Sequence, residues 1–452
     1  MDTLPCFKAY DIRGRVPDEL NEELAYRIGC ACAEFLAPGR AVIGHDIRLS
    51  SQAMSDALAR GFMDSGVEVI DLGLCGTEEI YFATTHLKTG CGVIVTASHN
   101  PADYNGMKIV RSESRPVSGD TGLKEIEAMA ASASFTPRKT RGKRQTLDNR
   151  DAFIEHLLTH VSLENLKPLK IVVNGGNGCA GPLLDRLADR LPFTFIPILC
   201  EPDGTFPNGV PNPLLPENRS ITSRAVQEHA ADLGLAWDGD FDRCFLFDEQ
   251  GAFIEGYYMV GLLAKAILTA NPGEKIIHDP RLFWNTEEIV RAHGGIPVLC
   301  KTGHAFIKEK MRSENCIYGG EMSAHHYFRD FSYCDSGMIP WLLVCEILSR
   351  EQRPLSAMVR EMIESFPVSG EINSKVQDPD AVIAAIEKLY AGKKGETDHT
   401  DGYSFAADDY RFNIRKSNTE PVLRLNVETR GDRKLMEKKT AELLAIINSP
   451  VF

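Results

Sequence analysis

The sequence predicts an α/β protein with three similar α/β domains and a smaller C-terminal α+β domain. Its 452 residues correspond to roughly three domains of about 150 residues, with two or four also in range. Short apolar segments rich in β-forming residues alternate with helical patterns over most of the chain, which is typical of α/β folds. Near the C-terminus the pattern changes to that of a helix followed by antiparallel strands.

The first α/β region is predicted from four segments. AVIGH (41–45), VEVIDLG (67–73) and CGVIVTA (91–97) are apolar runs of strand length, and residues 50–66 between the first two have a helical pattern. A strand, a helix and a further strand in this order indicate a parallel sheet with a crossover helix.

The same pattern recurs further along the chain. KIVVN (170–174) predicts a strand and PLLDRLADRL (182–191) the helix behind it, and further strands are expected at 233–240, 244–248 and 275–279. These segments indicate a second and a third α/β region.

Polar stretches between these regions mark candidate boundaries, at 133–151, 248–253 and 365–372. After the last boundary, a helix is expected at 380–390, followed by two antiparallel strand candidates. We therefore expect domains at residues 1–147, 148–249, 250–367 and 368–452.

Composition and charge exclude several classes of protein. A hydrophobic fraction of 43% and a charged fraction of 25% are average for globular chains and exclude a disordered or coiled-coil protein. The net charge of −13, with no long basic run, predicts neither a nucleic-acid partner nor an anionic membrane partner. An anionic substrate would need a local basic pocket to reverse this sign.

The cysteines predict a reducing compartment. Twelve cysteines are scattered without a CxxC pair or metal-ligand spacing, and most lie in apolar stretches, as expected of packed thiols in a cytosol. No apolar run reaches the roughly 18 residues that span a bilayer, and the N-terminus lacks an apolar signal segment. We expect a cytoplasmic protein.

A row of alternating carboxylates follows a predicted strand. WDGDFDR places Asp238, Asp240 and Asp242 at every second position, beside Arg243. Three carboxylates so spaced can converge on one hard cation such as Mg²⁺, and ligand sites in α/β folds gather where strands end. The alternative is a solvated acidic turn.

A second polar cluster follows the strand at 91–97. The segment VIVTASHNPADYNGMKI (93–109) presents Ser98 beside His and Asn, where the serine can act as a nucleophile or a phosphate carrier. Ser and Asn also form turns and helix caps in loops. A GxSxG elbow is absent from the segment, which disfavours a serine hydrolase.

The basic pocket that an anionic substrate requires is predicted near the C-terminus. RKSNTEP (415–421) supplies two cations, two hydroxyls and one amide in consecutive positions, which suits a phosphate dianion. The alternative is an ordinary hairpin turn, although a turn does not need this set of donors.

Two further loops carry candidate polar groups. In GGEMSAHHYF (319–328), Glu321 and Ser323 can bracket the vicinal hydroxyls of a sugar. TGHAFIKEKM (302–311) adds His304 and Lys308, although a single histidine is more often structural than catalytic.

The loop GNGCAG (176–181) supports an alternative function. It matches GxGxxG after a predicted strand and before a helix, and Glu201 follows at the right distance, as in dinucleotide-binding folds. An NAD-dependent oxidoreductase is therefore the alternative. It leaves the aspartates and the two donor loops unexplained, and such a glycine-rich turn also serves close packing.

The motifs TASHNP, DGDFDR, GEMSAHH and RKSNTEP occur in this order, and together they resemble the α-D-phosphohexomutase family. The resemblance extends from KAYDIRG (8–14) to the end of the chain. It implies four domains around a central cleft, of which the first three share an α/β core and the fourth is smaller and mobile.

The resemblance implies a role for each motif residue. Ser98 is the implied phosphoserine, and Asp238, Asp240 and Asp242 hold Mg²⁺ beside it. Phe241 departs from the common DGDGDR, but it lies between the ligands, where its side chain can point away. The other implied contacts are Tyr10, Arg13, Lys108, Arg243 and His304 to the reacting groups, with Lys108 or His304 as the proton acceptor; Glu321, Ser323 and His325 to the sugar hydroxyls; and Arg415, Ser417, Asn418 and Thr419 to the non-reacting phosphate.

The resemblance also implies the reaction. A phosphoserine enzyme would interconvert mannose 6-phosphate and mannose 1-phosphate through a 1,6-bisphosphate of mannose or glucose, which also activates it. Mannose 1-phosphate would supply GDP-mannose synthesis, and glucose phosphates are possible further substrates. The expected partner is a small-molecule sugar phosphate.

Overall fold

The structure is a computed structural model of the chain and describes residues 4–132, 135–416 and 422–449. Its internal contacts divide the chain into two compact units. The first comprises Met1–Phe253 with His325–Gln352, and the second comprises Ile254–Ala324 with Arg353–Phe452.

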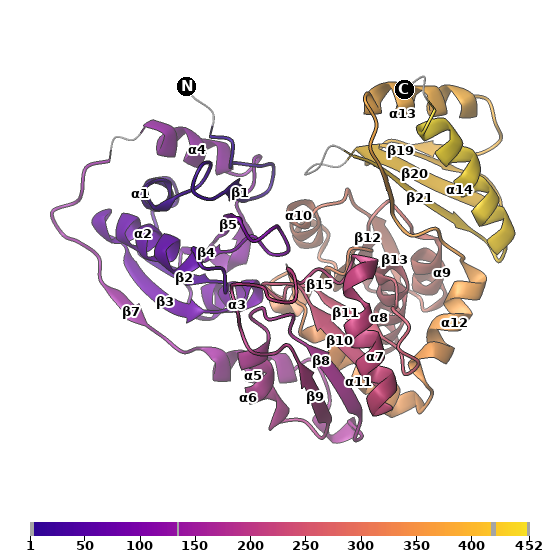
Figure 1. Cartoon of the computed structure of the whole chain (residues 1–452), viewed down its shortest axis with the longest axis horizontal. Coiled ribbons are helices and arrows are strands. Elements are labelled where there is room, and N and C mark those ends of the chain that lie inside the picture. Colours follow the sequence, from indigo (N-terminus) through magenta and orange to yellow (C-terminus); the bar gives the residue numbers. More distant parts are fainter. Residues whose placement is uncertain (1–3, 133–134, 417–421, 450–452) are drawn as a thin grey trace. The chain divides into compact units, whose positions relative to one another are not determined.

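The first unit begins with a seven-stranded sheet whose strand order is β1-β5-β4-β2-β3-β7, with β6 on β5 (Figure 1). Strands β4, β2, β3 and β7 run parallel, whereas β1, β5 and β6 pair antiparallel. The strands are β1 (Ile12–Arg15), β2 (Arg40–His45), β3 (Glu68–Leu74), β4 (Cys91–Val95), β5 (Tyr104–Arg111), β6 (Arg115–Pro116) and β7 (Arg144–Thr146).

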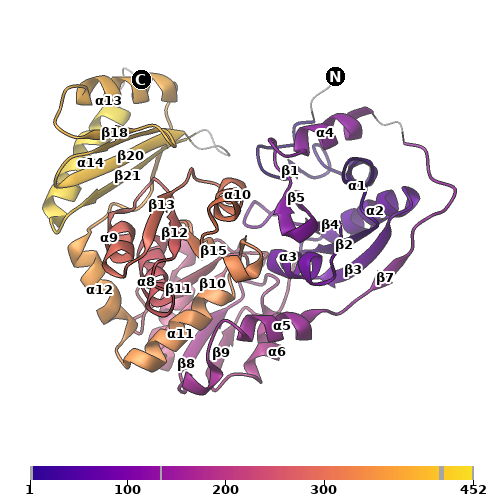
Figure 2. The ribbon, with the colours of Figure 1, turned by 180° about the vertical axis from the view of Figure 1, so that it is seen from behind.

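Helices cover both faces of this sheet because successive strand residues point in opposite directions. In β2, Ala41 and Ile43 belong to one hydrophobic cluster with α1, α2 and α4, whereas Val42 belongs to another with α3. Figures 1 and 2 show this three-layer arrangement. The helices are α1 (Glu22–Leu36), α2 (Ser51–Asp64), α3 (Thr77–His86) and α4 (Leu123–Ser132).

A second sheet of the first unit has the order β11-β10-β8-β9. Strands β9, β8 and β10 are parallel, and β10 and β11 form an antiparallel pair joined by residues 238–243. Helix α7 packs on this sheet through Ala225 and Val226. The elements are α5 (Arg150–Leu158), β8 (Lys170–Asn174), α6 (Gly181–Ala188), β9 (Thr194–Ile198), α7 (Ser220–His229), β10 (Leu233–Trp237) and β11 (Cys244–Phe247).

Residues 325–352 complete the first unit. They form the antiparallel pair β15 (His326–Phe328) and β16 (Cys334–Asp335) and helix α11 (Ile339–Glu351). The indole Nε1 of Trp237, at the end of β10, donates to Gly337 O at 3.0 Å. This contact fastens the segment to the second sheet beside the aspartate loop.

The second unit starts with a parallel sheet of the order β13-β12-β14. Helices α8 and α9 lie next to each other, and α12 packs on α8. The elements are α8 (Gly256–Ala270), β12 (Lys275–His278), α9 (Trp284–Ala292), β13 (Ile296–Leu299), α10 (His304–Glu314), β14 (Tyr318–Gly320) and α12 (Leu355–Ser365).

The C-terminal domain is an antiparallel sheet, in the order β17-β21-β20-β19-β18, with two helices on one face. Residues of α13 and α14 share one hydrophobic cluster with β19, β20 and β21, so this domain has its own core. The elements are β17 (Ile372–Ser374), α13 (Pro379–Tyr390), β18 (Glu396–Asp398), β19 (Tyr403–Ala406), β20 (Tyr410–Lys416), β21 (Leu423–Thr429) and α14 (Arg433–Ile447).

The predicted fold class is confirmed. Strands occur at each position named above as a strand segment, and the helices expected at 50–66, 182–191 and 380–390 are α2, α6 and α13. Across residues 4–132, 135–416 and 422–449, no helix has both the length and the apolarity to cross a lipid bilayer.

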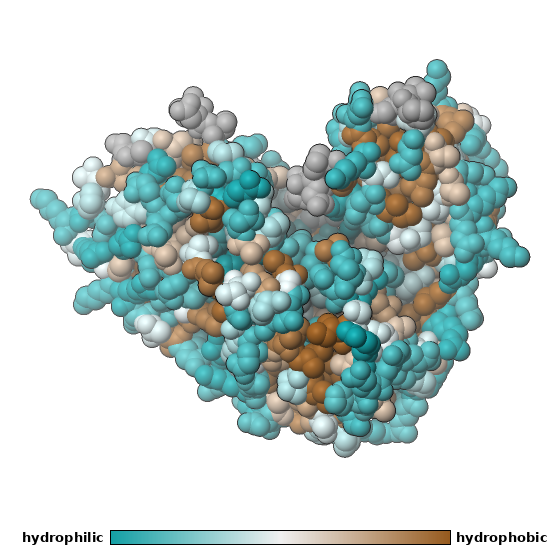
Figure 3. Space-filling model, in the orientation of Figure 1, coloured by the Kyte–Doolittle hydropathy of each residue, from teal (hydrophilic) through white to brown (hydrophobic). Residues whose placement is uncertain are grey.

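The surface carries few large hydrophobic side chains. The face in Figure 3 is mostly hydrophilic, with small hydrophobic areas. Among the described residues, the exposed large hydrophobics come from six separate segments: Phe35, Leu49, Leu163, Leu215, Ile296 and Leu389. Single exposed residues of this kind are normal in globular proteins.

Candidate active site

The aspartates of the β10–β11 loop form a buried cluster, called here the carboxylate triad (Asp238, Asp240 and Asp242). One oxygen of each lies within 4.8 Å of the others, and each residue is at most 1% exposed. A solvated acidic turn would expose its carboxylates, so that interpretation does not fit. The Oδ1 atoms of Asp240 and Asp242 are buried and accept no hydrogen bond within the described residues.

Ser98 lies directly beside this triad. It follows β4 and has a left-handed backbone (φ 49°), which costs a non-glycine residue roughly 1–3 kcal/mol. Its Oγ donates to Asp238 Oδ2 at 2.8 Å. The expected turn is also present, since the Ser98 amide donates to Thr96 Oγ1 at 2.9 Å. The turn thus presents the hydroxyl to a carboxylate.

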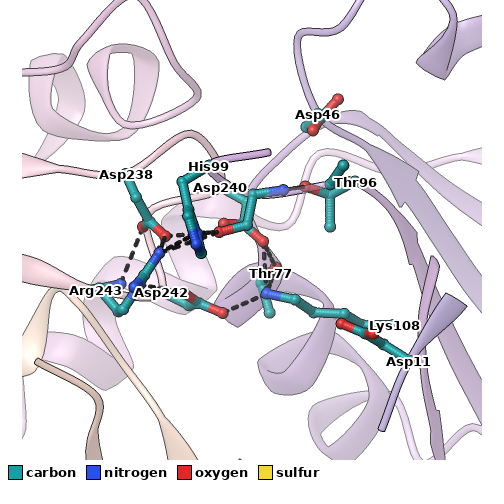
Figure 4. Close-up of polar contacts among 12 residues, drawn as sticks. Asp11, Asp46, Thr77, Thr96, His99, Lys108, Asp238, Asp240, Asp242 and Arg243 are labelled. Carbon is teal, nitrogen blue, oxygen red and sulfur yellow. Dashed lines mark hydrogen bonds and ion pairs between the residues drawn. The ribbon is translucent and has the colours of Figure 1, made fainter. Parts of the chain in front are cut away.

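Lys108 reaches the other side of the triad from β5. Its Nζ lies 2.7 Å from Asp240 Oδ2 and 2.5 Å from Asp242 Oδ2 (Figure 4). The pairing of β4 with β5 explains its position, because Ile94 stands opposite Lys108 and leads into the Ser98 turn. Burial lowers the pKa of Lys108, but the two carboxylates outweigh it and raise that pKa, so the amine is cationic.

The triad carboxylates differ in acidity. Burial raises the pKa of Asp242 to about 6, with the Asp240 charge adding to the effect. For Asp240, burial acts in the same direction, but Lys108 and the Thr77 hydroxyl, at 2.6 Å, hold its pKa below the ordinary value. The cluster therefore holds at least one full negative charge near neutral pH.

The donor set fits a hard divalent cation. Such ions take carboxylate and hydroxyl oxygens, and two of the triad oxygens are buried and accept no hydrogen bond within the described residues. An uncompensated buried carboxylate oxygen is costly, so a cation at this position satisfies a need that the described protein atoms leave open.

Arg243 and His99 border the serine. Arg243 donates from Nε and Nη2 to Asp238 Oδ2, at 2.9 and 2.6 Å, and its Nη2 lies 3.4 Å from Ser98 Oγ. It also donates to His99 Nδ1 (Figure 4). Burial, followed by the Arg243 charge, lowers the pKa of His99 well below its usual value, so this imidazole is neutral.

Arg13 joins the site through β1, which pairs with β5 and sets Arg13 opposite Gly106. Its Nε donates to Asp11 Oδ2 at 2.8 Å, and its guanidinium also donates to the Asn100 side chain. Burial lowers the pKa of Arg13, and Asp11 raises it to give a net increase. Tyr10, just before β1, is half-buried.

His325 is the last of the predicted site residues that lie in the first unit. Its Nδ1 lies 3.0 Å from Asp335 Oδ2, and His325, Asp335 and Asp242 form a second compact group of possible metal ligands. Burial lowers the pKa of His325, but the bond to Asp335 and the charge of Asp242 outweigh it and raise the pKa.

The second unit places two of the predicted sugar contacts, Glu321 and Ser323, beside Arg281. Asp279 accepts both Nε and Nη2 of Arg281, at 3.0 and 2.9 Å, and also the Met322 amide at 2.9 Å. Arg281 Nη2 lies 3.6 Å from Glu321 Oε1 and 3.4 Å from Ser323 Oγ. Asp279 therefore orients Arg281 and the loop that carries Glu321 and Ser323.

Arg415 lies near the end of β20 in a group of cations around Glu371, and its Nε also lies 3.9 Å from Asp401 Oδ2. Glu371 Oε2 lies 3.2 Å from Arg415 Nη2 and 3.5 Å from Arg281 Nη1, and Glu371 Oε1 lies 3.2 Å from Arg424 Nη1. Burial raises the pKa of Glu371, and the three guanidinium groups outweigh it and lower the pKa. Ser417, Asn418 and Thr419, the other predicted phosphate contacts, lie outside the described residues.

His304 is the first residue of α10. The preceding Gly303 amide donates to Glu321 Oε1 at 3.2 Å. The structure thus places His304 in the second unit, beside the loop that carries Glu321, whereas Ser98, Lys108, Arg13, Arg243 and His325 belong to the first.

Comparison with protein families gives matches over most of the chain. Models of the phosphoglucomutase/phosphomannomutase alpha/beta/alpha domains I, II and III match residues 5–137, 151–251 and 255–366, and the model of the C-terminal domain matches residues 371–445. The chain belongs to the phosphoglucomutase/phosphomannomutase family. The resemblance inferred from the motifs is confirmed.

Close relatives in this family span the whole chain. A phosphomannomutase of Salmonella montevideo is 59% identical, over 99% of this chain and 100% of its own length. A protein of Xanthomonas campestris called phosphohexose mutases is 60% identical, over 98% of both chains. A crystal structure of a phosphoglucomutase/phosphomannomutase family protein from Burkholderia thailandensis superposes with a TM-score of 0.88 and 32% identity, over 100% of this chain and 99% of the other.

The glycine-rich loop has a packing role in this member of the family. The Cys179 amide donates to Gly239 O at 3.1 Å, and a Cβ on Gly178 would approach that same oxygen to 2.8 Å. The glycine-rich loop therefore packs directly against the aspartate loop. The NAD-dependent oxidoreductase has no support, since all four domain matches are to phosphoglucomutase/phosphomannomutase models.

The Phe241 side chain packs inside the protein. It is fully buried with a left-handed backbone (φ 46°), and its ring packs against Gly76 at the start of α3. Its neighbour Asp240 is held by Thr77, the first residue of that helix. The departure from the family's DGDGDR thus adds an anchor for the triad loop.

Several polar residues of the site were not expected from the sequence. Asp335, Asp279, Glu371 and Arg281 act through tertiary contacts that no motif predicts. Arg48 was also not expected, although the sequence contains an indication of its position. The segment HDIRLS places charged residues directly after β2, and β2 ends at the same sheet edge as β4, which leads to Ser98.

Proposed function

We propose that this chain interconverts mannose 6-phosphate and mannose 1-phosphate through a phosphorylated Ser98. The observation that carries the proposal is the hydrogen bond of 2.8 Å from Ser98 Oγ to Asp238, inside a buried carboxylate triad. A relative named phosphomannomutase that is 59% identical over 99% of the chain supports the choice of reaction.

The carboxylate triad, with Ser98, is proposed to hold Mg²⁺. The oxygen-only donor set favours a hard cation. The buried Oδ1 atoms of Asp240 and Asp242, which accept no hydrogen bond within the described residues, support this assignment. A bound divalent cation supplies charge neutralisation at the phosphoryl group.

The chain's own residues position and neutralise the reacting groups. Phosphoryl transfer depends chiefly on alignment and electrostatic stabilisation. Arg243, 3.4 Å from Ser98 Oγ, and the cationic Lys108 are placed for this task. His99 accepts a hydrogen bond from Arg243. Because its imidazole is neutral, it orients the guanidinium without electrostatic repulsion.

The proposed cycle has two transfers. In the first, the bond between Ser98 Oγ and phosphorus breaks, and the phosphoryl group moves to the free hydroxyl of the sugar monophosphate, whose proton goes to His304. Lys108, the other acceptor expected from the sequence, is already cationic beside Asp240 and Asp242 and cannot take this proton. In the second, Ser98 Oγ attacks the other phosphorus of the 1,6-bisphosphate, the bond between that phosphorus and the sugar oxygen breaks, and the sugar oxygen takes back the proton as a hydroxyl. The bisphosphate of mannose or glucose is therefore both intermediate and activator.

The second unit is proposed to bind the substrate. Glu321 and Ser323, with His325 of the first unit, read the sugar hydroxyls, and Arg415 with Ser417, Asn418 and Thr419 holds the non-reacting phosphate. Tyr10 and Arg13 contact the reacting groups. The position of Arg415 supports the phosphate assignment, because its guanidinium lies with those of Arg281 and Arg424 around Glu371, and guanidinium groups bind phosphate oxygens through paired N–H donors.

The four domains are proposed to divide these tasks. Residues 1–147 carry the phosphoserine, residues 148–249 the metal loop, residues 250–367 the sugar loop, and residues 368–452 the phosphate loop. We propose that mannose is the preferred sugar and that glucose phosphates are also accepted.

The cellular setting is proposed to be the cytoplasm. All twelve cysteines are free thiols, as expected in a reducing compartment. The net charge of −13 is unfavourable for nucleic acid, and the partner is a small-molecule sugar phosphate. The mannose 1-phosphate formed would feed GDP-mannose synthesis.

A coupled assay tests the function. Purified protein with Mg²⁺ and a trace of glucose 1,6-bisphosphate should convert mannose 1-phosphate to mannose 6-phosphate, and EDTA should stop it. Ser98→Ala should remove turnover, whereas Ser65→Ala, at the half-buried C-terminal cap of α2, should not. Turnover by Ser98→Ala close to that of the unmodified protein would rule the phosphoserine mechanism out.

A further inference from the structure

Arg48 gathers the carbonyl groups of the loop that carries Ser98. Its Nη1 donates to Pro101 O at 2.7 Å and to Tyr104 O at 2.9 Å. Its Nη2 donates to Ser98 O at 3.0 Å and to Asn100 O at 2.6 Å. One side chain thus satisfies four peptide carbonyls in residues 98–104, called here the serine loop.

The planar geometry of the guanidinium group allows one side chain to donate to all four carbonyls. It carries five N–H groups in one rigid plane, and here four point to carbonyl oxygens while Nε lies 3.3 Å from Asp46 Oδ2. Arg48 is 3% exposed, so water does not compete with these bonds. Hydrogen bonds from a buried cation are roughly twice as strong as neutral ones.

A second layer of contacts fixes Arg48 itself. Asp46 Oδ1 accepts the Arg48 amide at 2.9 Å and the Ser51 hydroxyl at 2.5 Å. Ser51 Oγ in turn accepts from Asn105 Nδ2 at 2.9 Å. The ring of Phe206 lies 5.4 Å from the guanidinium carbon. All of these residues belong to the first unit.

The serine loop needs such a restraint. Ser98 has a left-handed backbone, which costs roughly 1–3 kcal/mol and persists only where surrounding contacts enforce it. Without Arg48, four carbonyls would lose their charged donor, and the loop would be free to relax. The hydroxyl of Ser98 would then leave its 2.8 Å contact with Asp238.

We propose that Arg48 is a positioning residue that holds Ser98 in the geometry required for phosphoryl transfer. This inference rests on the proposed function. Arg48 acts on the loop backbone, whereas the proposed sugar and phosphate contacts lie mainly in the second unit. Its loss therefore lowers kcat and leaves KM for the sugar phosphate nearly unchanged.

The first test compares Arg48→Lys with Arg144→Lys. Lysine keeps the charge but its single ammonium cannot reach four carbonyls. Arg144 is the control, since it is an arginine of the same unit, in β7, and pairs with Asp56 and Asp71 instead of the serine loop. Arg48→Lys should lower kcat about 10- to 100-fold, speed amide hydrogen exchange in residues 98–106, and leave KM within a factor of about two.

A chemical rescue separates positioning from a general structural effect. In Arg48→Ala, added methylguanidinium should restore part of kcat, whereas methylammonium, which lacks the planar fork, should not. Arg48→Lys with kcat and exchange rates equal to those of the unmodified protein would overturn the inference, as would equal rescue by both cations.

Asp46→Asn keeps the inference testable if changes at Arg48 prevent folding. It retains shape but removes the charge that orients the guanidinium, so it should lower kcat in the same direction and by a smaller factor. An unchanged kcat, or loss of the folded state in both variants, would mean that Arg48 stabilises the fold and does not position Ser98. Inactivity of the unmodified protein would instead count against the proposed function, so the two failures are distinguishable.

Discussion

Phe241 and Gly76 form a matched pair: a Cβ atom on residue 76 would lie within 2.6 Å of three ring atoms of Phe241. The ring belongs to the metal loop and the glycine to the start of α3, whose first residue, Thr77, donates to Asp240. This van der Waals contact therefore connects the loop that carries the triad to helix α3 of the first sheet, in addition to the hydrogen bond between Thr77 and Asp240.

Gly76→Ala should displace the Phe241 ring and with it the triad. We expect a loss of about 1–3 kcal/mol in stability from overpacking and weaker metal binding. Thermal unfolding and the Mg²⁺ concentration for half-maximal activity measure these effects. Gly39→Ala is the control, because a Cβ on Gly39 contacts nothing within 4 Å.

A double substitution shows whether the ring is the cause. Gly76→Ala combined with Phe241→Leu should bind metal better than Gly76→Ala alone, since the smaller side chain makes room. Strictly additive effects of the two changes would mean that the two residues do not interact.

Metal affinity should depend on pH through Asp242. Burial raises the pKa of this carboxyl to about 6, and a carboxylate must be deprotonated to bind a metal. Affinity should be constant above about pH 7 and fall roughly tenfold per pH unit below pH 6. Calorimetry on Ser98→Ala avoids the titration of a phosphoserine. A metal affinity that does not change between about pH 5 and pH 7 would contradict the assignment of Asp242 as a metal ligand.

Loss of Arg415 should affect binding of phosphate and not the choice of sugar. A hydrogen bond to a charged group contributes about 1.5–3 kcal/mol, so Arg415→Ala should raise KM for mannose and glucose phosphates by similar factors, roughly 10- to 150-fold. Lys394→Ala removes an exposed cation from the same domain and should change neither KM. A shift in the ratio of the two KM values would show that Arg415 contacts the sugar ring instead.

Asp335→Asn tests the support of His325. Asp335 is 1% exposed and lies 3.0 Å from the imidazole, and it is a cause of the raised pKa of His325. The variant should lower that pKa and reduce kcat about 10- to 100-fold, as measured by imidazole NMR and steady-state kinetics. Asp330→Asn, at an exposed position of the same segment, is the control, and an unchanged His325 titration in Asp335→Asn would argue against the pair.

The fold and the centre of the site were predictable because their signals are local. The alternation of Ala41, Val42 and Ile43 between two faces follows from strand geometry. Asp238, Asp240 and Asp242 follow one another in a single loop, and Ser98 stands at the end of an apolar strand.

The supporting residues were not predictable because their function depends on tertiary contacts. Arg48 binds backbone carbonyls of residues 98–104, which have no side-chain signature. Glu371 meets Arg281 and Arg424 from distant strands and loops. For Phe241, the sequence shows that it lies between the aspartates, but not that its ring packs against Gly76.

Mass spectrometry of Ser98 during turnover tests the central claim most directly. Incubation with glucose 1,6-bisphosphate and Mg²⁺ should add one phosphoryl group to the peptide that contains Ser98, and a chase with mannose 6-phosphate or mannose 1-phosphate should remove it at a rate no slower than kcat. Ser98→Ala should acquire no such group. Turnover of mannose phosphates without any phosphorylated Ser98, or with a phosphoryl group that the sugar phosphate cannot remove, would contradict the account.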